Sequence, residues 1–174
     1  AHTHPLLCVG DPLWGDVAVE ASVTPEVDGA RCGIVFRYRN NRCYYFFGFD
    51  ADRVALIRVR HEAEFHVPDE VVLAEASFER QPFTEYRLSA VATRDALTGS
   101  LDGVDLLSAN DDTYGAGKAG VIADDVTRFA GIRVTTTEAA REAFAILRSK
   151  RERELDHLRE ANPKPVLWKR FSTE

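Results

Sequence analysis

The chain has 174 residues, a formal net charge of −6 and a hydrophobic content of 45%, which is the size and composition of one folded domain with a good-sized core. The acidic balance argues against a protein that binds the phosphate backbone of nucleic acids, because such a protein presents a basic face. No run of about 18 apolar residues is present to span a bilayer, so we expect neither nucleic acid nor a membrane as a partner.

The first three quarters of the chain read as short strands separated by turns. Residues 14–24 alternate between apolar and polar side chains and are followed by Pro25 and the turn signal Asp28-Gly29. The dipeptide Asp102-Gly103 is a strong signal for a tight hairpin turn. Many short strands without helices between them predict an antiparallel sandwich or barrel. The other expected strands are residues 54–60, 71–74, 86–93, 98–101, 105–109, 119–123 and 129–135.

Residues 32–50, CGIVFRYRNNRCYYFFGFD, are predicted to form a β-hairpin that turns at Asn40-Asn41. Asparagine tolerates the left-handed backbone of a tight turn, and the flanking residues are β-branched or aromatic. Pairing about this turn places Tyr38 opposite Cys43. Because neighbouring side chains of a strand point to opposite faces of the sheet, Phe36 is expected in the core and Arg37 on the other face. We therefore expect a polar, aromatic-lined sheet surface around Arg37.

The chain has three cysteines, Cys8, Cys32 and Cys43, without the spacing of a metal site. Cys32 and Cys43 are expected at different heights on paired strands, which disfavours a bridge between them, although either could reach Cys8. We expect buried free thiols.

Residues 137–162 are predicted to form a long helix, because this segment is rich in Ala, Leu, Glu and Arg and contains neither Gly nor Pro. Thr135 with Glu138 fits a capping box, and Asn162-Pro163 is a stop signal. Pairs such as Arg148 with Glu152 favour a solvated spacer. Alternatively, Leu155 and Leu158 of its apolar stripe contact a neighbouring domain or a second copy of the chain. The stripe consists of Ala140, Phe144, Leu147, Leu155 and Leu158.

The predicted organisation is a β-sandwich over residues 1–136, the helix over 137–162, and a linker over 163–174. The last segment contains Pro163, Pro165 and the apolar run Val166-Leu167-Trp168. We expect it to lead into a further domain of the same parent protein.

The order of these segments resembles the concanavalin A-like, laminin G-like jelly-roll domains over residues 14–135. The resemblance is carried by FRYR followed by YYFF, and by the turn Asp102-Gly103 followed by Asp112, Tyr114, Gly117 and Gly120. The helix with its ending PKPVLWKRF is similar to the linker after the N-terminal sandwich of secreted bacterial rhamnogalacturonan lyase-like proteins. This resemblance implies a lectin-like, carbohydrate-associated module that is exported to the extracellular space or periplasm.

Four residues have the chemistry to bind a sugar, namely Arg37, Tyr45, Arg58 and His61. Planar donors such as Arg bind hydroxyl edges, aromatic rings bind apolar faces, and Arg can pair with the carboxylate of an acidic sugar. The alternative is that Tyr45 is a core residue and that the arginines pair with Glu20 or Glu85 across the sheet.

A catalytic site requires a more exact arrangement of side chains than a sugar-binding site does. The Glu-x-Asp-x-x-Glu pattern of sandwich glucanases is absent. A lyase acting on a uronic-acid glycan would need a cation for the carboxylate and a base within hydrogen-bond reach of the α-proton. The same four residues could supply both groups, so a polysaccharide lyase is the enzymatic alternative, although we expect no activity from this chain alone.

Paired aspartates mark a possible calcium site at a loop rim. Asp111-Asp112 and Asp124-Asp125 could give some of the six to eight oxygens that Ca²⁺ requires, with carbonyls and water supplying the others. Paired Asp in a turn also has a plain role in turn geometry.

The sequence therefore predicts an all-β, antiparallel jelly-roll β-sandwich followed by a long C-terminal helix. Its predicted role is a noncatalytic module of a polysaccharide-degrading protein that binds acidic plant-type glycans on one sheet face. A structural domain that mediates contacts between domains or subunits is the third alternative.

Overall fold

The computed structural model describes residues 5–60 and 69–161, which form eleven strands and one helix. The strands are β1 (Leu6–Val9), β2 (Val17–Pro25), β3 (Cys32–Asn40), β4 (Cys43–Asp50), β5 (Arg53–Arg60), β6 (Asp69–Ser77), β7 (Tyr86–Thr93), β8 (Ala96–Leu101), β9 (Val104–Asn110), β10 (Lys118–Ala123) and β11 (Thr127–Thr135), and the helix is α1 (Glu138–Ala161).

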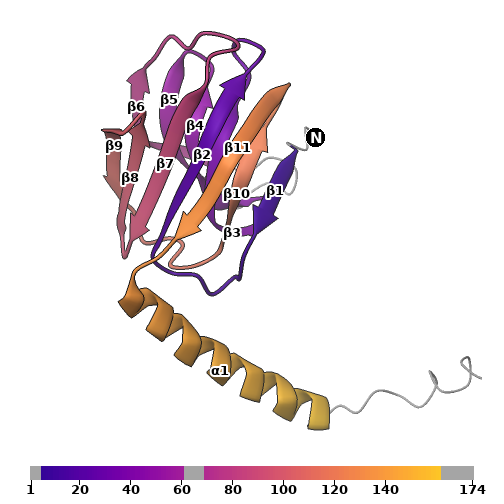
Figure 1. The fold of residues 1–174 in the computed structure, drawn as a ribbon. Helices are drawn as coiled ribbons and strands as arrows, with labels where there is room; N and C mark the ends of the chain where they lie inside the picture. The colour runs from indigo at the N-terminus through magenta and orange to yellow at the C-terminus, as the bar shows by residue number, and fades with distance from the viewer. Residues whose placement is uncertain (1–4, 61–68, 162–174) are drawn as a thin grey trace, which may run out of the picture.

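Two antiparallel sheets are stacked as the layers of a sandwich (Figure 1). One sheet has six strands in the order β1-β10-β3-β4-β5-β6, and the other has five in the order β11-β2-β7-β8-β9. Sheets that pack face to face bury one side of each strand, and this requires the alternating pattern seen in the sequence. The jelly-roll sandwich with a C-terminal helix is thus confirmed.

The core between the sheets is built from every second residue of the paired strands. From the six-stranded sheet, Phe36, Phe47, Phe49 and Leu56 are fully buried, and Val19 is one of the residues facing them from the five-stranded sheet. Complete burial of each such side chain stabilises the fold by about 1.5–3 kcal/mol. This core is the main source of stability for both sheets.

The hairpin of β3 and β4 forms, but its register differs from the prediction. Asn40, rather than Tyr38, lies opposite Cys43, and the pairing shifts between Phe36 and Asn40. Arg37 has a φ of 46°, in the left-handed region that residues other than glycine rarely adopt. This local bulge breaks the alternation, so the prediction that Arg37 faces away from the core is wrong.

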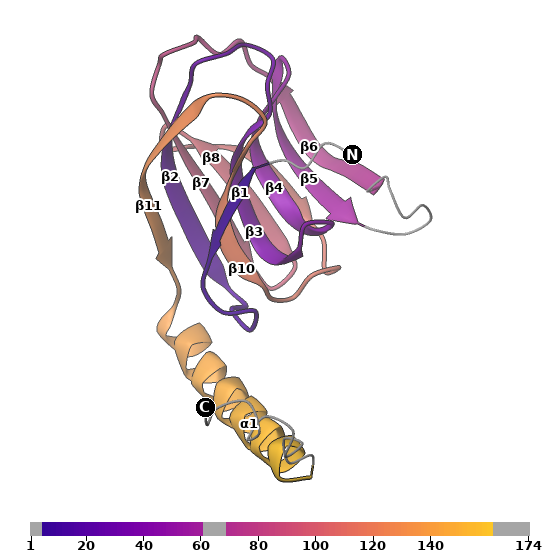
Figure 2. The same ribbon diagram turned by 90° about the vertical axis from the view of Figure 1, so that its right-hand side faces the viewer.

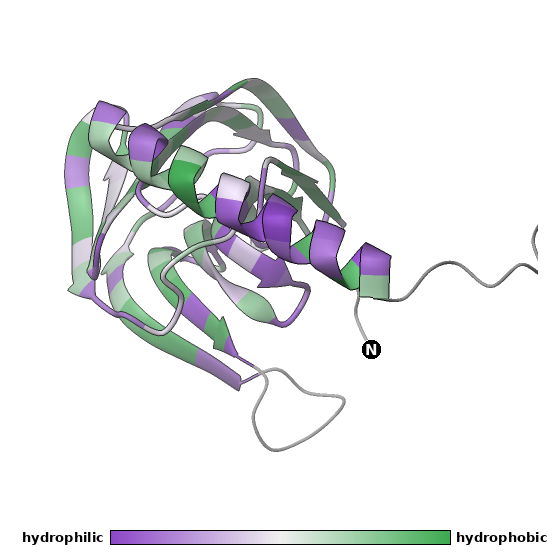
Figure 3. Cartoon of the chain, turned by 90° about the horizontal axis from the view of Figure 1, so that it is seen from below, coloured by the Kyte–Doolittle hydropathy of each residue, from purple (hydrophilic) through white to green (hydrophobic). Residues whose placement is uncertain are grey.

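Helix α1 extends away from the lower end of the sandwich (Figure 2). Its cap is Thr137, whose Oγ1 accepts a hydrogen bond from the backbone N–H of Ala140 at 3.2 Å, and not Thr135 as predicted. None of the 24 residues of α1 is buried. Figure 3 shows a mostly hydrophilic helix with a few apolar patches. Within the described ranges, no helix has the length and apolar character needed to cross a membrane.

The three cysteines are free, as predicted. Cys32 is buried, whereas Cys8 and Cys43 are partly exposed. Burial raises the pKa of the Cys8 thiol to about 11 despite the nearby charge of Lys118, so this thiol is protonated at neutral pH.

Candidate functional site

Three of the four predicted sugar-binding residues, Arg37, Tyr45 and Arg58, come together, but they do so inside the sandwich. Only 1% of the Arg37 surface is exposed, and its guanidinium donates hydrogen bonds to the carbonyl oxygens of Tyr114 at 3.0 Å and Gly15 at 3.3 Å. Burial lowers the pKa of Arg37 although neighbouring acidic groups oppose the change. Arg37 therefore holds the loop between β9 and β10 and is closed to a ligand.

Asp111 lies at the centre of this interior network, which we call the Asp111 cluster (Tyr45, Arg58, Asp111, Thr113 and Tyr114). The Tyr45 hydroxyl donates to Asp111 Oδ1 at 2.6 Å and accepts from the Tyr114 N–H at 3.1 Å. Arg58 donates to Asp111 Oδ2 and, at 3.1 Å, to Thr113 Oγ1. The Asp111 cluster joins the β9–β10 loop to β4 and β5.

The pKa changes of Tyr45 and Asp111 agree with a structural role for the Asp111 cluster. Burial raises the pKa of Tyr45 to about 12, with a further contribution from its hydrogen bond to Asp111, so its hydroxyl is a neutral donor near pH 7. Burial also acts to raise the pKa of Asp111, but hydrogen bonds from Tyr45 and Thr113 and the charge of Arg58 outweigh it and lower that pKa. A buried tyrosine of this kind is a poor candidate for the base of a lyase.

The four candidate calcium ligands do not meet. Asp124 follows Ala123, which pairs with Cys32 at the start of β3, whereas Asp111 contacts Tyr45 beside the turn that joins β3 to β4. Among residues 5–60 and 69–161, no group of three or more His, Cys, Asp and Glu side chains could hold a metal ion. The paired aspartates therefore do not fit one calcium site, and calcium binding by either pair stays a prediction. The fourth sugar-binding candidate, His61, lies outside the described residues.

The sheet face that points away from the core carries a second set of apolar side chains. This outer face of the six-stranded sheet has a buried floor that includes Phe46 of β4 and Ile57 of β5, which are directly paired. The other members of the floor are Val35, Tyr44, Ala55, Val59 and Ile122, with Leu6, Cys8 and Tyr38 partly buried against them.

Above this floor lies a network that we call the Arg31 cluster (Arg31, Asp50, Arg53, Glu70 and Glu75). Arg31 Nε donates to Asp50 Oδ1 at 3.0 Å, and its two terminal nitrogens donate to the two oxygens of Glu70 at 2.6 and 2.8 Å. Arg53 joins the same Asp50 at 2.8 Å and also pairs with Glu75. The guanidinium of Arg31 lies 5.3 Å from the centre of the Phe46 ring.

The Arg31 cluster is mostly buried at Arg31 and Asp50 and opens to solvent at its other members, Arg53, Glu70 and Glu75. Its side chains range from 12% exposed at Arg31 to 51% at Glu75. Burial acts to raise the pKa of Asp50, but hydrogen bonds from Arg53 and Arg31 outweigh it and lower that pKa. Asp50 is therefore ionised near neutral pH, and its hydrogen bonds hold Arg31 and Arg53 in place before any ligand arrives.

Sequence reasoning missed the Arg31 cluster. Asp50 and Arg53 flank a short turn between β4 and β5, so their spacing was a usable signal. The contact of Arg31 with Glu70 joins residues 39 positions apart and depends on the strand order of the folded sheet.

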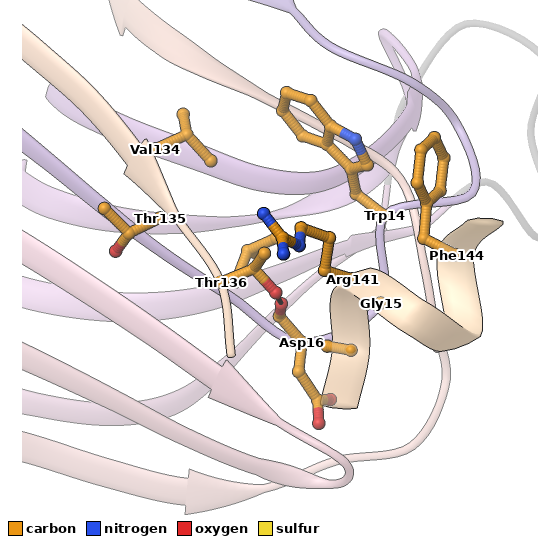
Figure 4. A pocket seen from close by; sticks show the side chains of 10 residues that line it. Trp14, Gly15, Asp16, Val134, Thr135, Thr136, Arg141 and Phe144 are labelled. Atoms are coloured by element: carbon orange, nitrogen blue, oxygen red, sulfur yellow. Dashed lines mark hydrogen bonds between the residues drawn. The ribbon is translucent and has the colours of Figure 1, made fainter. Parts of the chain in front are cut away.

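A pocket lies where α1 leaves the sandwich (Figure 4). This pocket has a volume of about 210 Å³ and is lined by Trp14 and Phe144, among other residues. The Thr136 hydroxyl donates to the Asp16 carbonyl oxygen at 2.6 Å and fixes the start of the helix against the sheet. The lining combines apolar side chains with four polar residues, Asp16, Thr135, Thr136 and Arg141.

No protein-family model matches the sequence, and no curated protein matches it. Solved structures share the fold. The carbohydrate-binding module CBM66 from Bacillus subtilis is 20% identical, with a TM-score of 0.59 over 70% of this chain and 76% of that one. Sheep galectin-11 is 8% identical, with a TM-score of 0.53 over 76% of this chain and 98% of that one.

A third similar structure is domain 4 of an extracellular arabinanase from Geobacillus stearothermophilus, solved in complex with arabinotriose. It is 13% identical, with a TM-score of 0.51 over 74% of this chain and 65% of that one. At these identities the likeness establishes the sandwich fold of this chain, and its function must be argued from its own residues.

Proposed function

We propose that this chain is a noncatalytic carbohydrate-recognition module that binds sugar at the Arg31 cluster. One observation carries the proposal: a planar guanidinium, held by two carboxylates, lies over an aromatic ring on the solvent side of the six-stranded sheet. Sugar hydroxyls both donate and accept hydrogen bonds, so they can contact carboxylate oxygens and guanidinium N–H groups at once. The fixed geometry of the cluster lowers the ordering cost of such binding.

The similar structures support this proposal through what their names state of them. One is a carbohydrate-binding module, one is a galectin, and one is a domain in complex with arabinotriose. A shared fold does not transfer a ligand, so this support adds to the argument from the Arg31 cluster and does not replace it.

Several finer predictions rest on the sequence alone. These are the likeness to rhamnogalacturonan lyase-like proteins, a polysaccharide-degrading parent protein with a further domain, and an exported location. The prediction of acidic glycans depended on Arg37 and Arg58, and Arg37 is closed to a ligand while Arg58 is paired with Asp111. The lyase alternative depended on these two arginines together with Tyr45 and His61.

Arg31→Ala is expected to weaken the binding of an oligosaccharide by about 10- to 100-fold, since a hydrogen bond to a charged group contributes about 1.5–3 kcal/mol. Calorimetric titration of the purified chain against a panel of oligosaccharides made of arabinose, galactose, glucose, fructose or galacturonic acid measures this. Glu70→Gln is a second variant that keeps the shape of the side chain and leaves Arg31 in place. It tests the contribution of the Glu70 carboxylate to sugar binding.

The matched control is Arg128→Ala. Arg128 lies on β11 of the opposite sheet and pairs with Glu26. This substitution should leave the affinity unchanged. Equal affinity for the Arg31, Glu70 and Arg128 variants would place the sugar elsewhere, and no binding to any member of the panel would contradict the proposal itself.

A contact domain is the second candidate, and exposed apolar residues on α1 favour it. Ile146 is 71% exposed and Leu147 is 49% exposed, so the helix presents apolar surface that the sandwich does not cover. If this surface holds two copies together, the mass from light scattering should double as the protein concentration rises, and Ile146→Glu with Leu147→Glu should abolish the increase. A constant monomer mass would contradict self-association.

A further inference from the structure

The Arg31 cluster also indicates which sugars it accepts, and this inference rests on the proposed function. The cluster contains two guanidinium groups, Arg31 and Arg53, and three carboxylates, Asp50, Glu70 and Glu75. Its net charge is therefore −1, on a chain whose own formal charge is −6.

The arginines of this face are already paired with carboxylates of the chain. Arg31 gives three of its N–H groups to Asp50 and Glu70, and Arg53 is shared between Asp50 and Glu75. A uronic acid could form a two-pronged pair with Arg31 only by displacing a carboxylate that already holds it, which exchanges one carboxylate for another. It would also bring a negative charge beside those that remain.

A neutral sugar can bind the Arg31 cluster without displacing a carboxylate. The oxygens of Glu70 each accept one hydrogen bond from Arg31 and keep further lone pairs for sugar hydroxyl donors. Arg31 keeps two of its five N–H groups without a partner in the described part of the chain, and these can donate to a sugar oxygen. Val72, 40% exposed and paired with Ile57 on the outer face, offers apolar surface beside Glu70.

We infer that the ligand is a neutral, hydroxyl-rich glycan, whose adjacent hydroxyl groups bridge Glu70 and Arg31, and not a uronic-acid glycan. Glu70 sets this specificity, because it neutralises Arg31 and accepts hydrogen bonds from the sugar hydroxyl groups. A protein that used this face for acidic sugars would leave a guanidinium without a carboxylate partner.

The test compares matched ligands, a galactose oligosaccharide and a galacturonic acid oligosaccharide of the same length, by calorimetric titration at two salt concentrations. The unaltered chain should bind the neutral ligand at least tenfold more tightly. Glu70→Gln should weaken neutral binding and strengthen acidic binding, because it removes a negative charge and frees Arg31. Salt should change neutral binding little, since an uncharged ligand has no charge to be screened.

The outcomes separate this inference from the proposed function. If the acidic ligand binds more tightly than the neutral one, and Arg31→Ala abolishes that binding, the inference is overturned while the proposed site stands. If neither this pair nor matched pairs built from other sugars bind, both are overturned. The inference is supported if Glu70→Gln loses the preference for the neutral ligand and Glu26→Gln keeps it. Glu26 is the acidic partner of Arg128 in the control pair on the other sheet.

Discussion

Asp111→Ala is expected to lower the free energy of unfolding by about 3–5 kcal/mol, because breaking a buried ion pair leaves the other charge without compensation. The Asp111 side chain is 8% exposed and its partner Arg58 is 19% exposed, so water replaces the lost carboxylate only in part. The substitution also removes the acceptor of the Tyr45 hydroxyl. Urea unfolding followed by circular dichroism measures the change.

The neighbouring residue gives the control for this substitution. Asp112 is exposed, so Asp112→Ala should change the stability by less than about 0.5 kcal/mol. The pKa of Asp111 is lowered in the folded chain, so its contribution is present above the unfolded pKa and is lost as the pH falls through the folded pKa. The stability difference between Asp111→Ala and the unaltered chain should therefore shrink below about pH 4. A difference that stays constant into strong acid would contradict the ionic role of Asp111.

Phe47→Ala should have an effect of similar size, a loss of about 3–5 kcal/mol, because it opens a cavity in the middle of the core. The Phe47 ring is fully buried and lies against Gly99 of the opposite sheet, where a Cβ would come within 2.1 Å of a ring carbon. Phe83→Ala is the matched control, since this ring is 71% exposed. Chemical unfolding of both variants gives the comparison.

The contact between Phe47 and Gly99 can be tested separately. Gly99→Ala should destabilise the unaltered chain by about 1–3 kcal/mol through overpacking, and by less in the Phe47→Ala background, where the added methyl group has space. Additive losses in the double variant would show that the two residues do not share one packing space.

Local patterns carried most of the fold prediction. Asp102-Gly103 was predicted as a tight hairpin turn, and both residues have positive φ between the paired strands β8 and β9. The alternation in residues 17–25 matches the burial of every second residue along most of β2. Such signals lie within a few residues of each other, so one sequence is enough to detect them.

The candidate site was harder to predict because it depends on a single backbone angle and on long-range pairing. One left-handed residue, Arg37, moved the side chain from the expected open face into the interior. Tyr45 and Asp111 were assigned to two separate sites, and they form one hydrogen-bonded network across 66 positions. Periodicity gives no information about either effect.

The Arg31 cluster was missed for a similar reason, because it depends on contacts between residues far apart in the sequence. Arg31 lies just before β3 and its partner Glu70 lies at the start of β6, and the sequence assigned neither residue to a site. Only the strand order β3-β4-β5-β6 brings them onto one sheet face. Sites of this kind require the topology before the residues can be interpreted.

Sugar binding at the Arg31 cluster can be tested by a nuclear magnetic resonance titration of the ¹⁵N-labelled chain with the tightest-binding neutral oligosaccharide. We expect amide shift changes that saturate and that gather around Arg31, Asp50, Glu70 and Val72, with β2, β7 and α1 unaffected. Changes confined to the five-stranded sheet or to the pocket beside Trp14 would contradict the proposed site, and an unchanged spectrum would contradict carbohydrate recognition by this chain.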